Sequence, residues 1–154
     1  MYVLSVPHSG TRWVLKHLRE WGHEVGAIHT NDPKWREVVA SEHKIVVPLR
    51  DPVMVGISAL NRDERSLAAD FNDLAPLVGR VHFVRVDCRT GDRDSEIRAL
   101  CDYLEIEPGS VDWAPYGSED DHLSLKAPYL EHGVVPVATN VASLTPETRE
   151  VLWP

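Results

Sequence analysis

Segments of strand-like composition alternate with segments of helical periodicity over most of this chain, and this alternation limits the possible folds more than any other feature. Strands are expected at residues 2–6, 24–28, 44–49 and 80–86. Helices are expected at residues 11–21, 35–40, 52–69 and 94–104. Such alternation is typical of an α/β fold with right-handed crossovers. We therefore expect three layers, with a mostly parallel central sheet between flanking helices.

Short polar side chains stand at the expected starts of several helices. An Asp, Ser or Thr side chain can accept a hydrogen bond from an N–H group of the first turn, which has no acceptor within the helix. The side chains expected to act in this way are Asp32, Asp51, Asp94 or Ser95, and Thr145. Each predicts where a helix begins.

The final third of the chain has a different character. From residue 108 to 145, prolines, glycines and acidic residues interrupt the alternation. One more strand is expected at 134–138 and a closing helix at 146–152. We therefore expect a single domain over 1–154, with a core at 1–107 and an irregular C-terminal segment at 108–154.

The charge of the chain excludes some classes of partner. Sixteen Lys and Arg against 24 Asp and Glu give a formal charge of −8, which argues against a nucleic-acid or anionic-membrane surface. A small anionic ligand is still possible, because it depends on the local field of its pocket. Cys88 and Cys101 form neither a metal spacing nor a disulfide framework, and no apolar run approaches the ~20 residues that span a membrane. We expect a complete cytoplasmic protein.

The loop after the first expected strand has the composition of an anion site. A strand runs into the small-residue turn Pro7–Gly10, which opens directly into a helix. Backbone N–H groups and a helix N-terminus then surround one concavity. The alternative is an ordinary strand–helix turn. The loop is not a Walker A motif, because Gly10 is followed by Thr11 and Arg12 rather than by Lys and Ser or Thr.

This loop resembles the 5′-phosphosulfate-binding loop of the sulfotransferase family, approximately Pro-Lys-Ser-Gly-Thr-Thr-Trp. The matching residues are Pro7, Ser9, Gly10, Thr11 and Trp13. Two positions differ, since His8 replaces the lysine and Arg12 the second threonine. In the family the lysine holds the leaving phosphate or the bridging oxygen. The resemblance implies a P-loop NTPase-like, sulfotransferase-type core.

A second motif resembles the same family. The strand at 44–49 leads into Arg50-Asp51-Pro52, and Ser58 follows the arginine by eight residues. In sulfotransferases the matching arginine and serine bind the 3′-phosphate of 3′-phosphoadenosine 5′-phosphosulfate (PAPS). Arginine suits phosphate because its planar fork offers parallel N–H donors. The alternative is a surface Arg–Asp pair with an unrelated helix serine.

A third match concerns the catalytic base. Cytosolic members carry a histidine some twenty residues before that arginine, and here His29 precedes Arg50 by 21. The resemblance implies that His29 takes the proton from the acceptor. Asp32 or Glu24 would be the acidic alternatives. Seven other histidines are present, so a packing or surface role for His29 is the competing interpretation.

The resemblance covers residues 1 to about 107. The expected strand and helix at 80–104, ending in Tyr103–Ile106, are similar to a late strand and helix of the family. The late Arg-Lys-Gly segment of larger members has no match, and Ser124–Lys126 and Tyr129 are candidate partial replacements. The short chain leaves little room for acceptor-binding insertions.

Together these motifs imply a sulfotransferase that transfers a sulfuryl group from PAPS to a hydroxyl or amine acceptor without a metal. The residues implied for PAPS are His8, Ser9, Gly10, Thr11, Arg12, Trp13, Arg50 and Ser58, and those for catalysis are His29 and His8. Trp13 is expected near the adenine. The alternatives are a P-loop-type small-molecule phosphotransferase and a non-catalytic nucleotide-binding module. The identity of the acceptor and the oligomeric state stay open.

The remaining aromatic and thiol side chains are expected to be structural. The tryptophans expected to pack are Trp21, Trp35, Trp113 and Trp153. The histidines expected to be structural or surface residues are His17, His23, His43 and His82. Cys88 and Cys101 are expected to behave as small buried hydrophobes.

Overall fold

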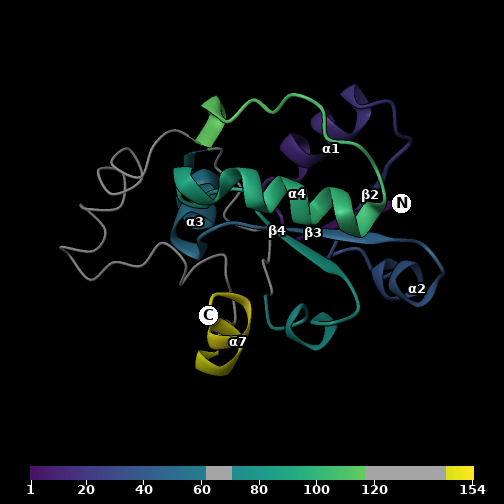
Figure 1. The fold of residues 1–154 in the computed structure, drawn as a ribbon. Helices are drawn as coiled ribbons and strands as arrows, with labels where there is room; N and C mark the ends of the chain where they lie inside the picture. The colour runs from purple at the N-terminus through teal and green to yellow at the C-terminus, as the bar shows by residue number, and fades with distance from the viewer. Residues whose placement is uncertain (62–70, 117–144) are drawn as a thin grey trace.

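In the part of the chain that the structure describes, a four-stranded, all-parallel sheet lies at the centre, in the order β2-β1-β3-β4. The strands are β1 Tyr2–Ser5, β2 Gly26–His29, β3 Ile45–Leu49 and β4 His82–Arg85. The computed structural model describes residues 1–61, 71–116 and 145–154 (Figure 1). The expected α/β class with a parallel sheet is confirmed.

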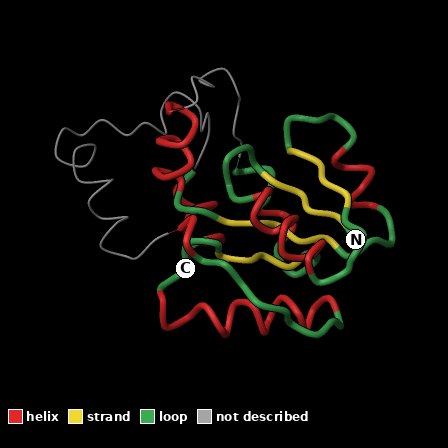
Figure 2. The backbone as a smooth tube through the Cα atoms, turned by 90° about the horizontal axis from the view of Figure 1, so that it is seen from above, coloured by secondary structure: helices red, strands yellow, loops and turns green. Residues whose placement is uncertain are grey.

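Helices cover both faces of the sheet and make the three layers (Figures 1 and 2). One face carries α1 Thr11–Glu20 and α4 Arg93–Leu104. The other carries α2 Trp35–Ala40, α3 Pro52–Asn61 and α7 Pro146–Leu152. Among the described residues, three short 3-10 helices lie in the connections, η1 Ala75–Leu77, η2 Thr90–Asp92 and η3 Ala114–Tyr116. No helix in these described ranges has the length and apolarity needed to cross a membrane.

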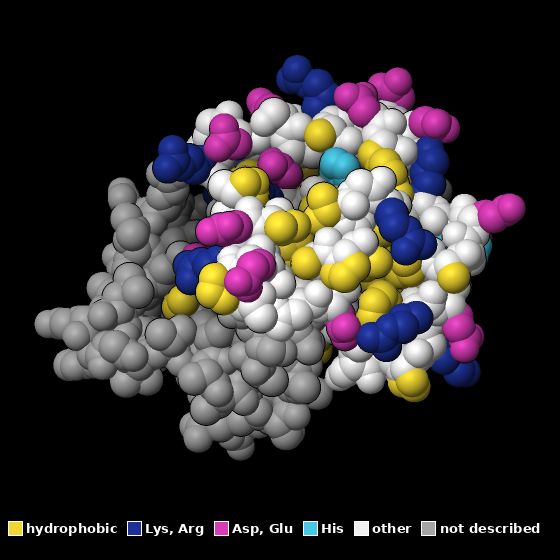
Figure 3. Space-filling view, turned by 90° about the horizontal axis from the view of Figure 1, so that it is seen from below, with side chains coloured by type: hydrophobic (Ala, Val, Ile, Leu, Met, Phe, Trp, Pro, Cys, Tyr) yellow, Lys and Arg dark blue, Asp and Glu magenta, His cyan; other side chains and the backbone are white. Residues whose placement is uncertain are grey.

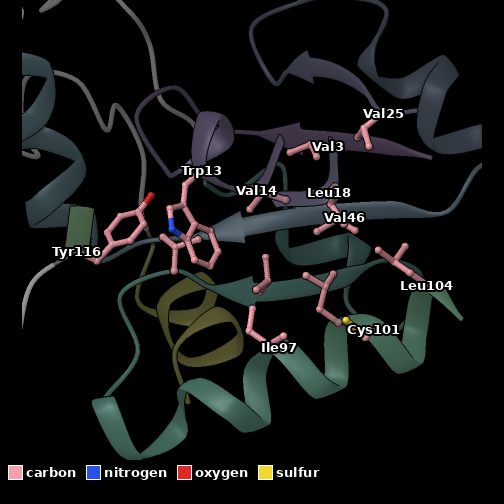
Figure 4. Packing of buried hydrophobic residues seen from close by; sticks show 13 residues of the cluster. Val3, Trp13, Val14, Leu18, Val25, Val46, Ile97, Cys101, Leu104 and Tyr116 are labelled. Carbon is pink, nitrogen blue, oxygen red and sulfur yellow. The ribbon is translucent and has the colours of Figure 1, made fainter. Parts of the chain in front are cut away.

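Alternating strand residues divide the core into two clusters. Val3 and Val46 face α1 and α4, where they pack with Leu18 and Ile97 (Figure 4). Leu4, on the opposite side of β1, belongs to the cluster under α2, α3 and α7. All five residues of β3 are buried, which explains its nearly continuous apolar sequence. Burying each such side chain stabilises the fold by roughly 1.5–3 kcal/mol.

The order of the strands creates a crevice at one end of the sheet. The chain leaves β1 for β2 on one side and returns past β1 to reach β3 on the other. The loops that follow β1 and β3 therefore diverge, and crevices of this kind hold ligands in α/β folds.

Pro48 lies in β3 beyond the point where β3 separates from β1. The Leu49 carbonyl accepts a hydrogen bond from the Val86 N–H, so the position where Pro48 lacks its donor is directed toward β1. Pairing between β1 and β3 ends at Val3 and Val46. The missing donor thus falls where the two strands have already separated, which is why a central strand tolerates a proline here.

Most expected elements are present, and two caps differ. Thr145 caps α7, its hydroxyl accepting from the Thr148 N–H, as expected. By contrast α4 begins at Arg93, before Asp94 and Ser95. The Asp32 carboxylate accepts from the Lys34 N–H in the turn before α2, which begins at Trp35.

Four of the expected features lie outside the described residues. They are the helical residues 62–69, the strand at 134–138, Ser124–Lys126 and Tyr129.

The tryptophans expected to pack do so, and of the two cysteines expected to be buried only Cys101 is. Trp21, Trp35, Trp113 and Trp153 all belong to or pack against the two core clusters. Cys101 is buried and Cys88 half-buried. His17 is buried and held by two hydrogen bonds, its Nδ1 to the Trp13 carbonyl at 2.8 Å and its Nε2 to the Asp112 N–H at 2.9 Å.

Candidate functional site

A cavity of about 700 Å³ opens where the chain leaves β1, β2 and β3. Nearly all of the residues implied by the three motifs line it. They are His8, Gly10, Thr11, Arg12, Trp13, His29, Arg50 and Ser58. These residues come from segments as far apart as the first helix and α3, so only the fold brings them together.

The turn before α1 is held in a shape that favours glycine. Gly10 has φ 111° and His8 has φ 68°, both in the left-handed region. A Cβ atom on Gly10 would lie 2.7 Å from the Tyr116 hydroxyl and 2.9 Å from Val86 Cγ2. The absence of a side chain at Gly10 is therefore needed for both the backbone angle and the packing.

Ser9 differs from its neighbours in the turn, since it does not line the cavity. Its side chain is fully buried, and its hydroxyl donates to the Val6 carbonyl at 2.7 Å. The Ser9 N–H donates to the same carbonyl at 3.2 Å. In this structure Ser9 closes the turn.

The backbone N–H groups of Thr11 and Arg12, in the first turn of α1, have no intrahelical acceptor and can receive an anion.

Arg50 and Ser58 both lie beside His8. Arg50 Nη1 donates to the His8 carbonyl over 3.5 Å, and Ser58 Oγ lies 3.3 Å from His8 Nδ1. The Arg50 guanidinium lies 5.3 Å from the centre of the Tyr116 ring. Its Nε is buried and makes no hydrogen bond to any described residue. A buried N–H donor of this kind favours an acceptor in the cavity.

Asp51 sets the start of the helix that carries Ser58. Its carboxylate accepts from the Val53 N–H at 2.8 Å, which is the cap expected from the sequence. Its own N–H donates to the Asp87 carboxylate at 2.7 Å. These two contacts join the end of β3 to the segment after β4 and fix the direction in which α3 leaves the sheet.

His29 ends β2 directly opposite Ser5 of β1. Its Nδ1 lies 2.9 Å from Ser5 Oγ and 3.3 Å from the Ser5 carbonyl oxygen. Ser5 Oγ also accepts from the Thr11 hydroxyl at 2.7 Å. The side chain of His29 is therefore oriented by the interior of the protein while it lines the cavity. Neither Glu24 nor Asp32 lines the cavity.

Trp13 forms a wall of the cavity rather than an exposed stacking surface. It is 6% exposed, and its Nε1 donates to the Asp112 carbonyl at 2.6 Å. Its ring packs against His17, Trp113 and Tyr116, with centroids 4.5, 4.7 and 5.6 Å away. Figure 4 shows the Trp13 and Tyr116 rings side by side.

Tyr116 is a cavity residue that the sequence motifs do not indicate. It reaches the site from η3, in the irregular segment after residue 107. Burial raises the pKa of its hydroxyl to about 12, and the nearby Arg50 charge opposes part of this rise. The phenol is therefore neutral at physiological pH, with its ring near the Arg50 guanidinium.

The charge of the cavity is opposite to that of the chain. Three cations line it, namely Arg12, Lys16 and Arg50, and no Asp or Glu does so among the described residues. On the face of the molecule in Figure 3, acidic and basic side chains are interspersed. The absence of carboxylates from the described lining, in a chain with 24 Asp and Glu, makes the cavity suitable for an anion.

Several further lining residues lack a recognisable sequence signal. They are Leu15, Lys16, Ala27 and Pro115, in addition to Tyr116. Asn31 also lines the cavity and does have a sequence signal, because it follows His29, the last residue of β2, by two residues. Comparison of the chain with models of protein families, with curated proteins and with solved structures finds no match.

Proposed function

We propose that this protein is a compact sulfotransferase that transfers a sulfuryl group from PAPS to a hydroxyl or amine acceptor. The observation that carries the proposal is the meeting of three separate sequence motifs at one cavity. The loop at 8–13, the Arg50–Ser58 pair and His29 match the family in their order along the chain. A sulfotransferase-type core and a cytoplasmic location are parts of the same proposal.

The described residues fit the donor in three respects. The buried Nε of Arg50 has no acceptor among the described residues, and a phosphate oxygen would supply one. The described lining carries cations and no carboxylates. The volume of about 700 Å³ lies within the roughly 300–1,000 Å³ of small-ligand sites. Arg50 and Ser58 would hold the 3′-phosphate, and the loop at 8–13 the 5′-phosphosulfate.

The donor, when bound, supplies a sulfuryl group joined to a phosphate leaving group. The acceptor oxygen or nitrogen bonds to sulfur, the bond from sulfur to the bridging oxygen breaks, and the proton of the acceptor passes to His29 Nε2. His8, which lies next to Ser58 and Arg50, would in its protonated form stabilise negative charge on the leaving phosphate. The N–H groups of Thr11 and Arg12 would orient its oxygens.

Calorimetry with adenosine 3′,5′-bisphosphate tests the donor site. Saturable binding is expected, and Arg50→Ala should weaken it roughly ten- to hundredfold, because a charged partner of phosphate is lost. Arg98→Ala is a matched control, since Arg98 is exposed on α4 and does not line the cavity. No binding at millimolar concentrations would refute the proposal, and equal affinity of the Arg50→Ala variant would remove Arg50 from the site.

Turnover separates the proposal from its two alternatives. With PAPS and a panel of hydroxyl and amine acceptors, a sulfotransferase releases adenosine 3′,5′-bisphosphate. Magnesium-dependent turnover of ATP would instead support a phosphotransferase. Binding of the bisphosphate without transfer to any acceptor would support a nucleotide-binding module. A gain of transfer activity in His8→Lys would then show that His8, which replaces the family lysine, is the cause of the lost activity.

A further inference from the structure

Tyr116 brings a hydroxyl group without a hydrogen-bond partner to the wall of the cavity. Its side chain is 6% exposed, and it lines the cavity together with Gly10 and Arg50. The hydroxyl makes no hydrogen bond to any described residue, and it is not one of the fully enclosed polar atoms. The hydroxyl oxygen is therefore accessible from the cavity. Because a nearly buried hydroxyl is unfavourable without a partner, this position favours a ligand that supplies one.

This hydroxyl lies against the turn before α1. A Cβ atom on Gly10 would be 2.7 Å from it, so the missing side chain of Gly10 allows the phenol to approach the backbone. Arg50 and Ser58 contact the same turn at His8. Polar side chains from α3, from the end of β3 and from η3 thus surround one part of the cavity.

The Arg50 guanidinium supplies a positive charge beside the Tyr116 ring. Its central carbon lies 5.3 Å from the ring centre. Hydrogen bonds of ~2.8 Å from both groups to different oxygens of one tetrahedral oxyanion can bridge this separation. One phosphate or sulfate group can therefore satisfy both side chains.

The Tyr116 hydroxyl would be the donor in a contact with an oxyanion. Burial raises its pKa to about 12, and the nearby Arg50 charge opposes part of this rise. The hydroxyl therefore keeps its hydrogen at physiological pH. Since the oxygens of a fully ionised phosphate or sulfate group can only accept, the phenol donates.

The segment before Tyr116 is fixed to α1, which holds the phenol in place. Trp13 Nε1 donates to the Asp112 carbonyl at 2.6 Å, and His17 Nε2 accepts from the Asp112 N–H at 2.9 Å. The Tyr116 ring also packs edge-on against Trp13, with centroids 5.6 Å apart (Figure 4). A donor that is ordered before the ligand arrives loses little conformational entropy on binding.

We propose that the Tyr116 hydroxyl donates a hydrogen bond to the same oxyanion that Arg50 holds, so that Tyr116 is a further ligand-binding residue of the cavity. An apolar ligand group would leave the hydroxyl unpaired, and a cationic group would be repelled by Arg50. The identification of this oxyanion as the 3′-phosphate of PAPS rests on the proposed function. The contact itself requires only a phosphate or sulfate group.

Tyr116→Phe tests the contact, because it keeps the ring against Trp13 and Arg50 and removes only the hydroxyl. Its affinity for adenosine 3′,5′-bisphosphate, measured by calorimetry, should be roughly tenfold lower than that of the wild type. Tyr2→Phe is the matched control, since Tyr2 begins β1 and does not line the cavity. It should bind like the wild type. Equal affinity of Tyr116→Phe and the wild type would overturn the proposal.

Carbon NMR reports the same contact without a change of sequence. The chain has only four tyrosines, so their Cζ carbons, labelled with ¹³C, give a simple spectrum whose shifts respond to hydrogen bonding of the hydroxyls. Tyr116→Phe identifies the signal of Tyr116. The probes are adenosine 3′,5′-bisphosphate and inorganic phosphate, and each should move this signal in the wild type but not in Arg50→Ala.

The two probes separate the contact from the proposed function. Binding of the bisphosphate that leaves the Tyr116 signal in place, or that moves it equally in Arg50→Ala, would overturn the contact alone. A shift with inorganic phosphate, when the bisphosphate does not bind, would support the contact and refute the proposed function. Absence of binding by both probes would overturn both.

Discussion

At the scale of single residues, His29 and its hydrogen-bond partner Ser5 differ in how readily the sequence identifies them. His29 ends an expected strand at a distance from Arg50 that resembles a known family, so it can be singled out. Ser5 is an ordinary strand residue until β2 pairs with β1 and places the two opposite each other. Ser9 shows the converse, because its motif position implies a ligand contact while its hydroxyl bonds to the Val6 carbonyl.

The Cys88 thiol is expected to react slowly. Burial, the charge of Glu96 and other nearby carboxylates raise its pKa from 9.0 to about 11, although Arg93 opposes part of the rise. Since the thiolate is the nucleophile, its population at pH 8 falls about a hundredfold. In a Cys101→Ser variant, alkylation by iodoacetamide at pH 8 should be slower than in urea by at least this factor. Equal rates in the two conditions would contradict the shift.

His82 is expected to make stability depend on pH. Burial lowers its pKa below 6.5, and its ring stacks on Tyr103 with centroids 5.2 Å apart. Between the two pKa values the unfolded chain binds more protons than the folded chain, so the free energy of unfolding rises with pH in this range. The contribution of the neutral His82 ring to stability is therefore complete above pH 6.5 and is lost as the pH falls below it.

The His82→Phe variant tests this dependence, because it keeps an aromatic ring against Tyr103 and removes the titration. Its free energy of unfolding in urea should fall less steeply than that of the wild type between pH 7 and pH 5. His43→Gln, at an exposed position, is the matched control and should keep the wild-type slope. Parallel slopes for His82→Phe and the wild type would exclude His82 as the origin.

At the scale of elements, local signals predict where helices and strands lie better than where their ends lie. The closing helix α7 at Pro146–Leu152 and the short helix α2 at Trp35–Ala40 have the expected bounds. The start of α4 differs because the 3-10 helix η2 leads straight into it, which moves the N-cap to Asp92. Such a continuation depends on the preceding turn, which sequence periodicity does not describe.

The cap of α7 is expected to contribute measurably to stability. Thr145 Oγ1 accepts from the Thr148 N–H at 3.2 Å, and α7 packs through Leu152 on the core. Thr145→Ala should lower the free energy of unfolding by about 1 kcal/mol, while Thr145→Ser should keep most of it. Urea unfolding measures both, and equal midpoints for Thr145→Ala and the wild type would show that the cap is not stabilising.

At the scale of the whole molecule, the order of the strands decides what the cavity contains. Because β1 lies between β2 and β3, the turn after β1 is flanked by His29 on one side and Arg50 on the other. The segment that ends in Tyr116 completes the wall from a distant part of the chain. The early departure of β3 from β1, at Pro48, leaves room for this meeting.

Gly10 lies against two of these distant parts, Tyr116 and Val86. Gly10→Ala would place a methyl group 2.7 Å from the Tyr116 hydroxyl and force an alanine to φ 111°. Gly79 also has a positive φ, 83°, but an added Cβ meets no atom of the described residues within 4 Å. Both alanine variants should be destabilised by on the order of 1 kcal/mol of backbone strain.

Gly10→Ala should lose roughly 1–3 kcal/mol more than Gly79→Ala, because Tyr116 and Val86 must also move. Denaturant unfolding of the pair isolates the packing contribution. Losses of the same size in both variants would show that the contact with Tyr116 does not constrain the turn.

The sequence by itself determined the α/β class, the approximate positions of the elements and the loops in which to look for ligand-binding residues, because periodicity and capping act over a few neighbouring residues. The tertiary structure decided the order of the strands, the contact of Ser58 with His8 and the hydrogen bonds that orient His29. It also decided that Tyr116 lines the cavity. These contacts join residues that are distant in the chain, and they depend on how the helices and strands pack together.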